Sequence, residues 1–246
     1  MRILTLLLTI SLIGCSNFTN QQTYPSLEEE CKLSESESSQ QCVIANADDT
    51  LLGEREYSMG LIHFFVGSGE IKNCDKAKYW FEQAAAKENL KALDALGVFY
   101  FSGCNAGQDY KKAEEYYILA NQKGSLQAKA NLGELYREGG YGIEQDYDKA
   151  LQWYQLTIKD NPYRAYNGLA SLYIDQEDYD EAYKYLVEAA DLDNPEAQYN
   201  LGVMYDRGVV VEQNKEQAKY WYKKAADNGW ADAQYNLNIL LSDQAK

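Results

Sequence analysis

The stretch AQYNLGVMYDRG, residues 197–208, is one of several near-copies of a single pattern in this chain of 246 residues. ALDALGVFYFSG (92–103) and AKANLGELYREG (128–139) follow the same frame. In each, Ala is followed four residues later by Leu-Gly, and a Tyr and a second Gly follow three and six residues after the first Gly. A pattern that returns in this way indicates internal repeats, which have to be identified before any other feature of the fold.

The Leu-Gly motif returns at nearly constant intervals along the chain. Its successive central positions are 37, 36, 37, 32 and 36 residues apart, and they are occupied by Gly60, Gly97, Gly133, Ala170, Gly202 and Asn238. A second motif, DKAKYWFEQAAA (75–86) in its first copy, runs in parallel. Its Ala positions, 77, 113, 150, 182 and 218, step by 36, 37, 32 and 36 residues. Two markers that share these irregular intervals indicate one repeated unit with two parts.

Both markers have the period of an amphipathic helix. Ala77, Trp80, Phe81, Ala84 and Ala85 occupy positions i, i+3, i+4, i+7 and i+8, which lie on one helical face. In the other motif, Ala197, Leu201, Met204 and Tyr205 occupy positions i, i+4, i+7 and i+8. Each unit is therefore predicted to contain a helix A, a turn, a helix B and a second turn. One such unit cannot bury its apolar face alone, whereas a stack of units forms one continuous core.

Three local features refine this prediction. A Gly inside helix A costs about 1 kcal/mol relative to Ala, which is tolerable if it lets helix B approach closely. The fourth unit is four to five residues shorter, because LYIDQEDYDEA (172–182) joins its two helices tightly. The last unit stops after its helix A, where Asn238 replaces the motif Gly, as expected for a capping helix.

The combined pattern resembles the Sel1-like repeats, which are longer-looped relatives of the tetratricopeptide repeat. The resemblance covers about residues 47–242, and the fourth unit is closer to an ordinary tetratricopeptide repeat. It implies an all-α fold over residues 46–246, a right-handed α-solenoid of five helix-turn-helix repeats plus a C-terminal capping helix. It also implies that the A helices line a concave surface for protein or peptide partners, and that the chain acts as a scaffold or adaptor.

The first residues, MRILTLLLTISLIGC (1–15), have the form of a secretory signal. One positive charge at Arg2 precedes an apolar run that is too short for a stable membrane-spanning helix. The ending Leu-Ile-Gly-Cys resembles the bacterial lipobox, which implies removal of residues 1–14 and lipidation of Cys15. Two or three acyl chains anchor a protein durably to a membrane. The alternative is an ordinary signal with an incidental Cys.

Residues 15–45 are expected to form the lipidated Cys and a flexible tether, because SNFTNQQTYPS (16–26) is polar and without period. Ser16 follows the Cys in place of the Asp that favours inner-membrane retention in enteric-type bacteria. We therefore expect a cell-envelope protein that is lipid-anchored to the outer membrane and faces the periplasm of a Gram-negative bacterium. Contact with the membrane is expected through the lipid anchor only.

The other four cysteines, Cys31, Cys42, Cys74 and Cys104, are an even number in a compartment that permits disulfides. Four cysteines allow three pairings. We prefer Cys31–Cys42, which are close in the chain, with Cys74–Cys104, which lie in related loops of neighbouring repeats. A metal site is the alternative, but the chain has no CxxC motif and only one His.

The composition argues against several classes of function. With 38 acidic and 23 basic residues the net charge is −15, whereas nucleic-acid binding relies on Lys and Arg contacts to phosphate. The single histidine, His63, falls at the repeat position of Tyr100 and is expected to be a packed residue. No catalytic constellation, cofactor site or metal site is therefore expected, and we predict a protein that is not an enzyme.

Candidate partner-binding residues follow from tetratricopeptide geometry, in which positions three before and one or four after the motif Gly face the groove. Tyr and Arg at such positions concentrate binding energy at interfaces. This selects Tyr57, Asp94, Phe101, Arg137, Asn167, Tyr199, Asp206 and Tyr235.

The leading functional hypothesis is an envelope lipoprotein that acts as a protein–protein interaction scaffold through the concave face of the solenoid. The partner is another protein, such as a toxin effector or an envelope protein. A narrower version, suggested by the resemblance, is an immunity protein that binds a secreted phospholipase effector. The alternatives are a β-lactam- or peptidoglycan-acting hydrolase of the cysteine-rich repeat type and a purely structural spacer.

Overall fold

The structure is a computed structural model that describes residues 24, 26–33, 53–65, 73–104 and 107–243. These residues form twelve α-helices and no β-strand; one isolated bridge pairs Gly140 with Ile143. None of the helices in the described ranges has the length and apolar character needed to cross a membrane. The prediction of an all-α fold is confirmed.

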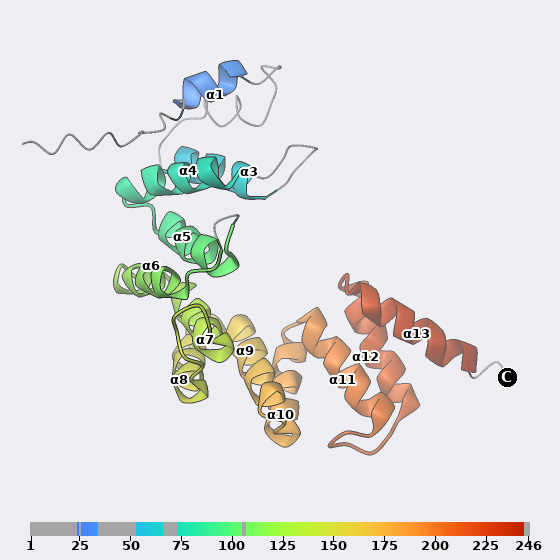
Figure 1. Cartoon of the computed structure of the whole chain (residues 1–246). Coiled ribbons are helices and arrows are strands. Elements are labelled where there is room, and N and C mark those ends of the chain that lie inside the picture. The colour runs from blue at the N-terminus through green and yellow to red at the C-terminus, as the bar shows by residue number, and fades with distance from the viewer. Residues whose placement is uncertain (1–23, 25, 34–52, 66–72, 105–106, 244–246) are drawn as a thin grey trace, which may run out of the picture.

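Eleven of the helices form five consecutive hairpins and one final single helix (Figure 1). Each hairpin packs against the next, so that the array curves from the N-terminal to the C-terminal helices (Figure 1). The α-solenoid of five repeats plus a capping helix is therefore confirmed. In chain order the hairpins are α3 (Glu54–Phe64) with α4 (Cys74–Ala86), α5 (Leu90–Ser102) with α6 (Tyr110–Gln122), α7 (Ala128–Glu138) with α8 (Tyr147–Thr157), α9 (Pro162–Asp175) with α10 (Tyr179–Asp191), and α11 (Pro195–Arg207) with α12 (Lys215–Asp227), followed by α13 (Ala231–Asp243).

The motif glycines allow an aromatic ring of helix B to lie directly on helix A. A Cβ atom on Gly97 would lie 2.2 Å from Cε1 of Tyr117, a distance that real Cβ contacts essentially never show. The same arrangement recurs in the other three repeats that carry the motif Gly. The remaining pairs are Gly60 with Phe81, Gly133 with Tyr154, and Gly202 with Tyr222.

The fourth repeat has a different pair of residues at these two positions. Ala170 occupies the place of the motif Gly, and Leu186 occupies the place of the aromatic ring. Both are 1% exposed and belong to the same core cluster. A larger residue on helix A is thus matched by a smaller one on helix B, as close packing requires.

Helix boundaries follow from side-chain caps. Asn or Asp precedes each B helix, and its side chain accepts a hydrogen bond from a backbone N–H of the first turn, the preferred N-cap arrangement. Gly103 caps the C-terminus of α5 with φ 70°, and a side chain there would collide with Gln108. The B-helix caps are Asn73, Asp109, Asp146, Asp178 and Asn214.

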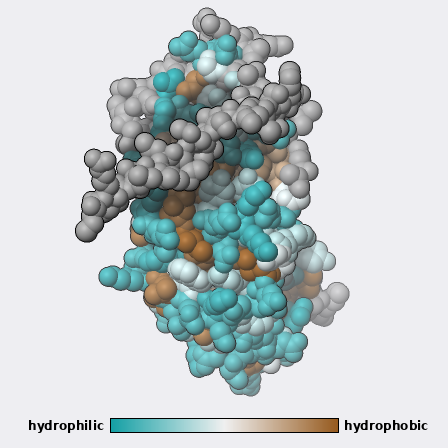
Figure 2. All heavy atoms as spheres, turned by 60° about the vertical axis from the view of Figure 1, so that its left-hand side comes forward, coloured by the Kyte–Doolittle hydropathy of each residue, from teal (hydrophilic) through white to brown (hydrophobic). Residues whose placement is uncertain are grey.

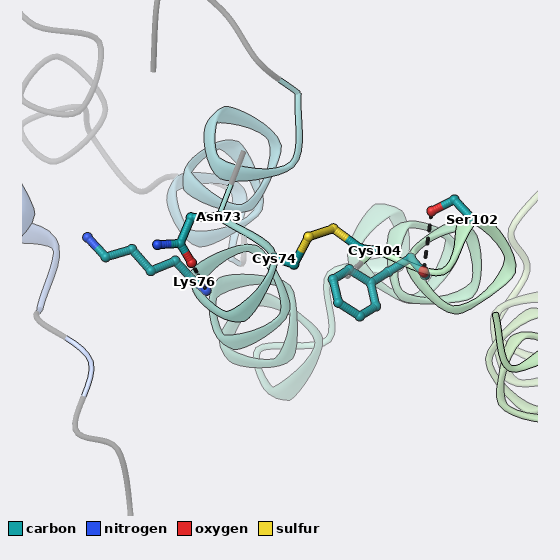
Figure 3. Close-up of a disulfide and its surroundings, with 6 residues drawn as sticks. Asn73, Cys74, Lys76, Ser102 and Cys104 are labelled. Carbon is teal, nitrogen blue, oxygen red and sulfur yellow. Dashed lines mark hydrogen bonds between the residues drawn. A yellow bond between two sulfur atoms is a disulfide. The ribbon is translucent and has the colours of Figure 1, made fainter. Parts of the chain in front are cut away.

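A disulfide joins Cys74, the first residue of α4, to Cys104, just after the end of α5 (Figure 3). The two Cα atoms are 5.7 Å apart, and both residues are buried. The bond therefore ties the first repeat to the second, as the preferred pairing predicts. For the other expected pair, Cys42 lies outside the described residues and the side chain of Cys31 is not described.

Within residues 15–45, which the sequence predicts to be a flexible tether, residues 27–33 form helix α1 (Leu27–Leu33). The physical reason is a capping box. The backbone N–H of Ser26 donates to Glu29 (2.7 Å), and the N–H of Glu29 donates back to the Ser26 hydroxyl (3.3 Å). Three glutamates in the first turn also stabilise the helix, because their negative charges interact favourably with the helix dipole.

Helix α1 contacts the first repeat through Glu30, which is 4% exposed. Its Oε1 lies 2.8 Å from Nζ of Lys76 and 3.6 Å from Nε2 of His63. Burial alone raises the pKa of Glu30, but the interactions with His63 and Lys76 outweigh burial and lower it. His63 is 7% exposed, which agrees with the prediction of a packed repeat residue.

Polar and apolar residues are unevenly distributed over the surface. On the face shown in Figure 2, hydrophilic residues predominate and hydrophobic residues gather in patches. Large apolar side chains that stay exposed include Phe65, Tyr179 and Tyr235. Contiguous hydrophobic patches on a surface mark candidate interaction sites more often than scattered single residues do.

Candidate functional site: a recess in the concave groove

A recess of about 300 Å³ lies across the N-terminal half of the solenoid. Four consecutive repeats contribute to it, so it exists only because the repeats stack. We call it the groove recess. Its lining consists of Tyr57, Leu61, Phe64, Phe65, Phe81, Lys91, Asp94, Ala95, Val98, Gln127, Asn131 and Arg164.

The walls of the groove recess are mainly apolar and aromatic. The ring of Tyr57 lies 6.0 Å from that of Phe81, and burial raises the pKa of Tyr57. Phe65, at the end of α3, is 61% exposed and lies edge-on to Phe64. A Tyr side chain has an apolar ring and a polar hydroxyl. Beside exposed apolar groups, it is typical of interfaces in which a few residues contribute most of the binding energy.

A positioned arginine occupies the polar side of the groove recess. Arg164 donates from Nη1 to Oε1 of Gln127 and from Nη2 to Oδ1 of Asn131, both at 3.0 Å. Asn131, which supplies the second acceptor, is buried, with 8% exposure. Among the described residues Arg164 takes part in no ion pair, and its charge acts on the nearby carboxyl group of Asp94.

Asp94 adds an acceptor to the same recess. Burial raises the pKa of its carboxyl group, whereas the hydrogen bond from the Ser125 hydroxyl and the charge of Arg164 lower it, and the net direction is upward. Its Oδ1 atom is buried and accepts no hydrogen bond from the described residues. The site thus combines an apolar wall, a fixed donor in Arg164 and an acceptor in Asp94.

Tyr57 and Asp94 are the two predicted partner-binding residues that the structure brings together in this recess. Arg164 was not predicted, because it lies six residues before the motif position rather than three. The signal was present: Lys91 and Gln127 occupy the same repeat position, and both also line the recess. A polar column at this position could therefore have identified it.

Three other predicted residues instead bond to neighbouring repeats. Arg137 forms ion pairs with Glu134 and with Asp175 of α9. Burial disfavours the charge of Arg137, but these carboxylates outweigh burial and raise its pKa. Asn167 donates to Glu196 (3.2 Å). The hydroxyl of Tyr199 accepts from Asn236 of α13 (3.3 Å). These side chains hold successive A helices in register.

The last three predicted residues lie apart from the groove recess. Phe101 stacks on Tyr110 with ring centroids 4.6 Å apart. Asp206 pairs with Lys215, which joins α11 to α12. Tyr235 on the capping helix is 68% exposed. Tyr235 is the one exposed residue among the eight predicted residues, and the other seven are half-buried.

Metal chemistry finds no support in the described ranges. No group of three or more His, Cys, Asp or Glu side chains converges there as metal ligands. His63 faces Glu30 and is absent from the lining of the groove recess.

The fold and the groove define the class of protein: a helix-turn-helix repeat solenoid with a concave binding surface. The chain belongs to the Sel1 repeat family. Five Sel1 repeats match residues 56–89, 90–125, 126–161, 163–194 and 195–230, which together span most of the chain. Sel1 repeat proteins mediate protein–protein interactions and are typically non-enzymatic scaffolds.

Similar proteins come from both eukaryotes and bacteria. The chitin synthase regulator SKT5 of Saccharomyces cerevisiae is 28% identical over 186 residues, which is 70% of this chain and 27% of that protein. The chain spans about a quarter or less of the length of the curated relatives it matches. A Sel1 repeat protein structure from Oxalobacter formigenes has a TM-score of 0.65 at 26% identity and covers 87% of this chain and 89% of its own.

A solved immunity protein from Pseudomonas aeruginosa is also similar. It has a TM-score of 0.52 at 20% identity and covers 74% of this chain and 67% of its own. At this identity the likeness shows a shared fold alone.

Proposed function

We propose that this protein is an envelope-anchored adaptor that binds one protein partner in its concave groove, with the groove recess as the main contact. The observation that supports this most is the recess itself. Its lining comes from four repeats, with the aromatic wall from the first and Arg164 from the fourth. Tyr and Arg are among the residue types that dominate interface energies. Extended concave surfaces are how repeat solenoids bind their partners.

The proposed location is the periplasmic side of the outer membrane of a Gram-negative bacterium. The support comes from the sequence of residues 1–15, which predicts a lipid on Cys15. A lipid anchor would hold the solenoid near the membrane without inserting it. Labelling with a radioactive fatty acid tests this directly, and a Cys15→Ser variant should lose both the label and the membrane fraction.

A narrower proposal is that the partner is a secreted phospholipase effector and that this chain is its immunity protein. The membrane address and the groove support it, because a phospholipase would act at the surface where this protein is anchored. Deleting the gene should then sensitise cells to an effector encoded beside it. Unchanged survival in the presence of that effector would rule the narrower proposal out and leave the adaptor role standing. No specific observation favours the hydrolase alternative.

Substitutions in the groove recess provide the test of the adaptor role. The partner is captured with the domain of residues 16–246 and its affinity is measured by calorimetry. We expect Tyr57→Ala to weaken binding about 30-fold, because truncating a central interface Tyr costs about 2 kcal/mol. Arg164→Gln should have an effect of similar size.

Tyr220→Ala on α12 is the matched control, since Tyr220 is 50% exposed and lies outside the recess lining. It should leave the affinity within about twofold of the original protein. Equal losses in Tyr57→Ala and Tyr220→Ala, or no loss in either recess variant, would contradict the proposed site. Circular dichroism checks that every variant remains folded.

A further inference from the structure

A second recess, of about 310 Å³, lies between the fourth and fifth repeats. Ile174 at the end of α9 and Tyr179 at the start of α10 form one side of it. Val203 and Met204 of α11, with Val209 beyond it, form the other. Tyr179 is 41% exposed and Val209 is half-buried, so the apolar surface is open to a partner. We call it the second recess.

The chain that borders the second recess is strongly acidic. Residues 175–181 read DQEDYDE, with five carboxylates in seven positions, and they begin directly after Ile174 and surround Tyr179. Arg137 neutralises Asp175, and Lys184 neutralises Glu181. Glu177 and Asp180 are exposed and form no ion pair within the described part of the chain.

The charges of this border are not arranged to hold a metal ion. In the described ranges no three acidic side chains converge as metal ligands. Asp178 is committed to the N-cap of α10, where it accepts from the backbone N–H of Glu181 at 3.2 Å. Carboxylates spread along a chain segment suit several separate cations, as on a Lys- or Arg-rich peptide. Such complementarity also speeds association.

We propose that the second recess binds a basic segment of a protein partner, which inserts an apolar side chain between Tyr179 and Val203 while its Lys or Arg residues face Glu177 and Asp180. Charge complementarity selects this occupant. The border offers the exposed carboxylates of Glu177 and Asp180, and the recess lining contains a single cation, Arg207. An acidic or neutral apolar segment would gain nothing from the border. The proposal goes beyond the adaptor function at the groove recess and does not depend on what that recess binds.

The probe for this proposal is a short synthetic peptide that carries several Lys and two Phe residues in a Gly-Ser background. Two companion peptides replace Phe with Ser, or Lys with Glu. Fluorescence anisotropy measures the binding of each peptide to the domain of residues 16–246. We expect the Lys-Phe peptide to bind at least about fivefold more tightly than the Lys-Ser peptide, and the Glu-Phe peptide not to bind measurably.

Matched charge variants separate the site from general attraction to an acidic protein. Glu177→Gln with Asp180→Asn removes two carboxylates at the border. Glu88→Gln with Asp75→Asn removes two elsewhere, in the same local settings: Glu88 and Glu177 both have positive φ (63° and 59°), and both aspartates are second residues of B helices.

The border variant should weaken binding of the Lys-Phe peptide about fivefold, at about 0.5 kcal/mol per exposed charge pair, and the control variant by less than about twofold. Tyr179→Ser should remove the preference for Phe over Ser. Equal losses from the two charge variants, or a Phe preference that survives Tyr179→Ser, would overturn the proposal. Loss of partner binding in Tyr57→Ala would leave this outcome unchanged, so the two sites can fail separately.

Discussion

Replacing Gly97 with Ala should destabilise the protein, although Ala is the better helix former by about 1 kcal/mol. The new Cβ would lie 2.2 Å from Cε1 and 2.4 Å from Cδ1 of Tyr117. Tyr117 is 2% exposed, so its ring cannot move out into solvent. Overpacking of this kind costs about 1–3 kcal/mol, and the extra strain here should make the net loss about 2 kcal/mol in urea unfolding followed by circular dichroism.

The fourth repeat supplies the control for this prediction. Gly97→Ala combined with Tyr117→Leu reproduces the combination of Ala170 and Leu186 at the same two positions of the fourth repeat. Tyr117→Leu alone should lose about 2–4 kcal/mol by leaving a cavity, and the added Ala methyl should recover part of that loss. The double variant should therefore be more stable than the sum of the two single effects predicts. A stabilising effect of Gly97→Ala alone would show that the ring does not lie on the helix as described.

Removing the disulfide should also cause a large loss of stability. We expect the double variant Cys74→Ser with Cys104→Ser to lose about 3.5 kcal/mol, because the bond closes a loop with a sequence separation of 30 residues. The loss should concentrate in the first two repeats, since stability in a solenoid is approximately a sum over repeats and their interfaces. Hydrogen exchange resolved by peptide should show faster exchange in α3, α4 and α5.

A reducing agent provides the matching control for the disulfide. It should lower the stability of the original protein by at least as much as the double substitution does. Any further loss on reducing the double variant would come from the remaining cysteines and so tests the expected Cys31–Cys42 bond. An unchanged unfolding midpoint in the double variant would contradict the stabilising role of Cys74–Cys104.

Much of the fold could be predicted because the copies of a repeat can be compared with one another. Two independent motifs with the same intervals fixed the number of hairpins, the short fourth unit and the final single helix. The place of Gly97 inside a helix also predicted close approach of helix B, which the contact with Tyr117 confirms. Each of these inferences needs only short-range sequence patterns and the burial of one helical face.

The candidate site could be predicted only in part, because side-chain partners are set by neighbouring repeats. The repeat frame places Arg137 and Asn167 on the concave face but does not show that they bond to Asp175 and Glu196. Arg164 stands one helical turn outside the positions that the frame selects. Helix α1 was missed because its capping box, Ser26 with Glu29, lies in a polar stretch without helical period.

The central claim is that the concave groove, and within it the groove recess, binds the partner protein. Hydrogen–deuterium exchange of the domain of residues 16–246, alone and with its captured partner, tests this most directly. We predict slower exchange in the complex around Tyr57 in α3, Asp94 in α5 and Arg164 in α9. Slower exchange confined to α4, α6 and α8, with no change in these three A helices, would contradict the claim.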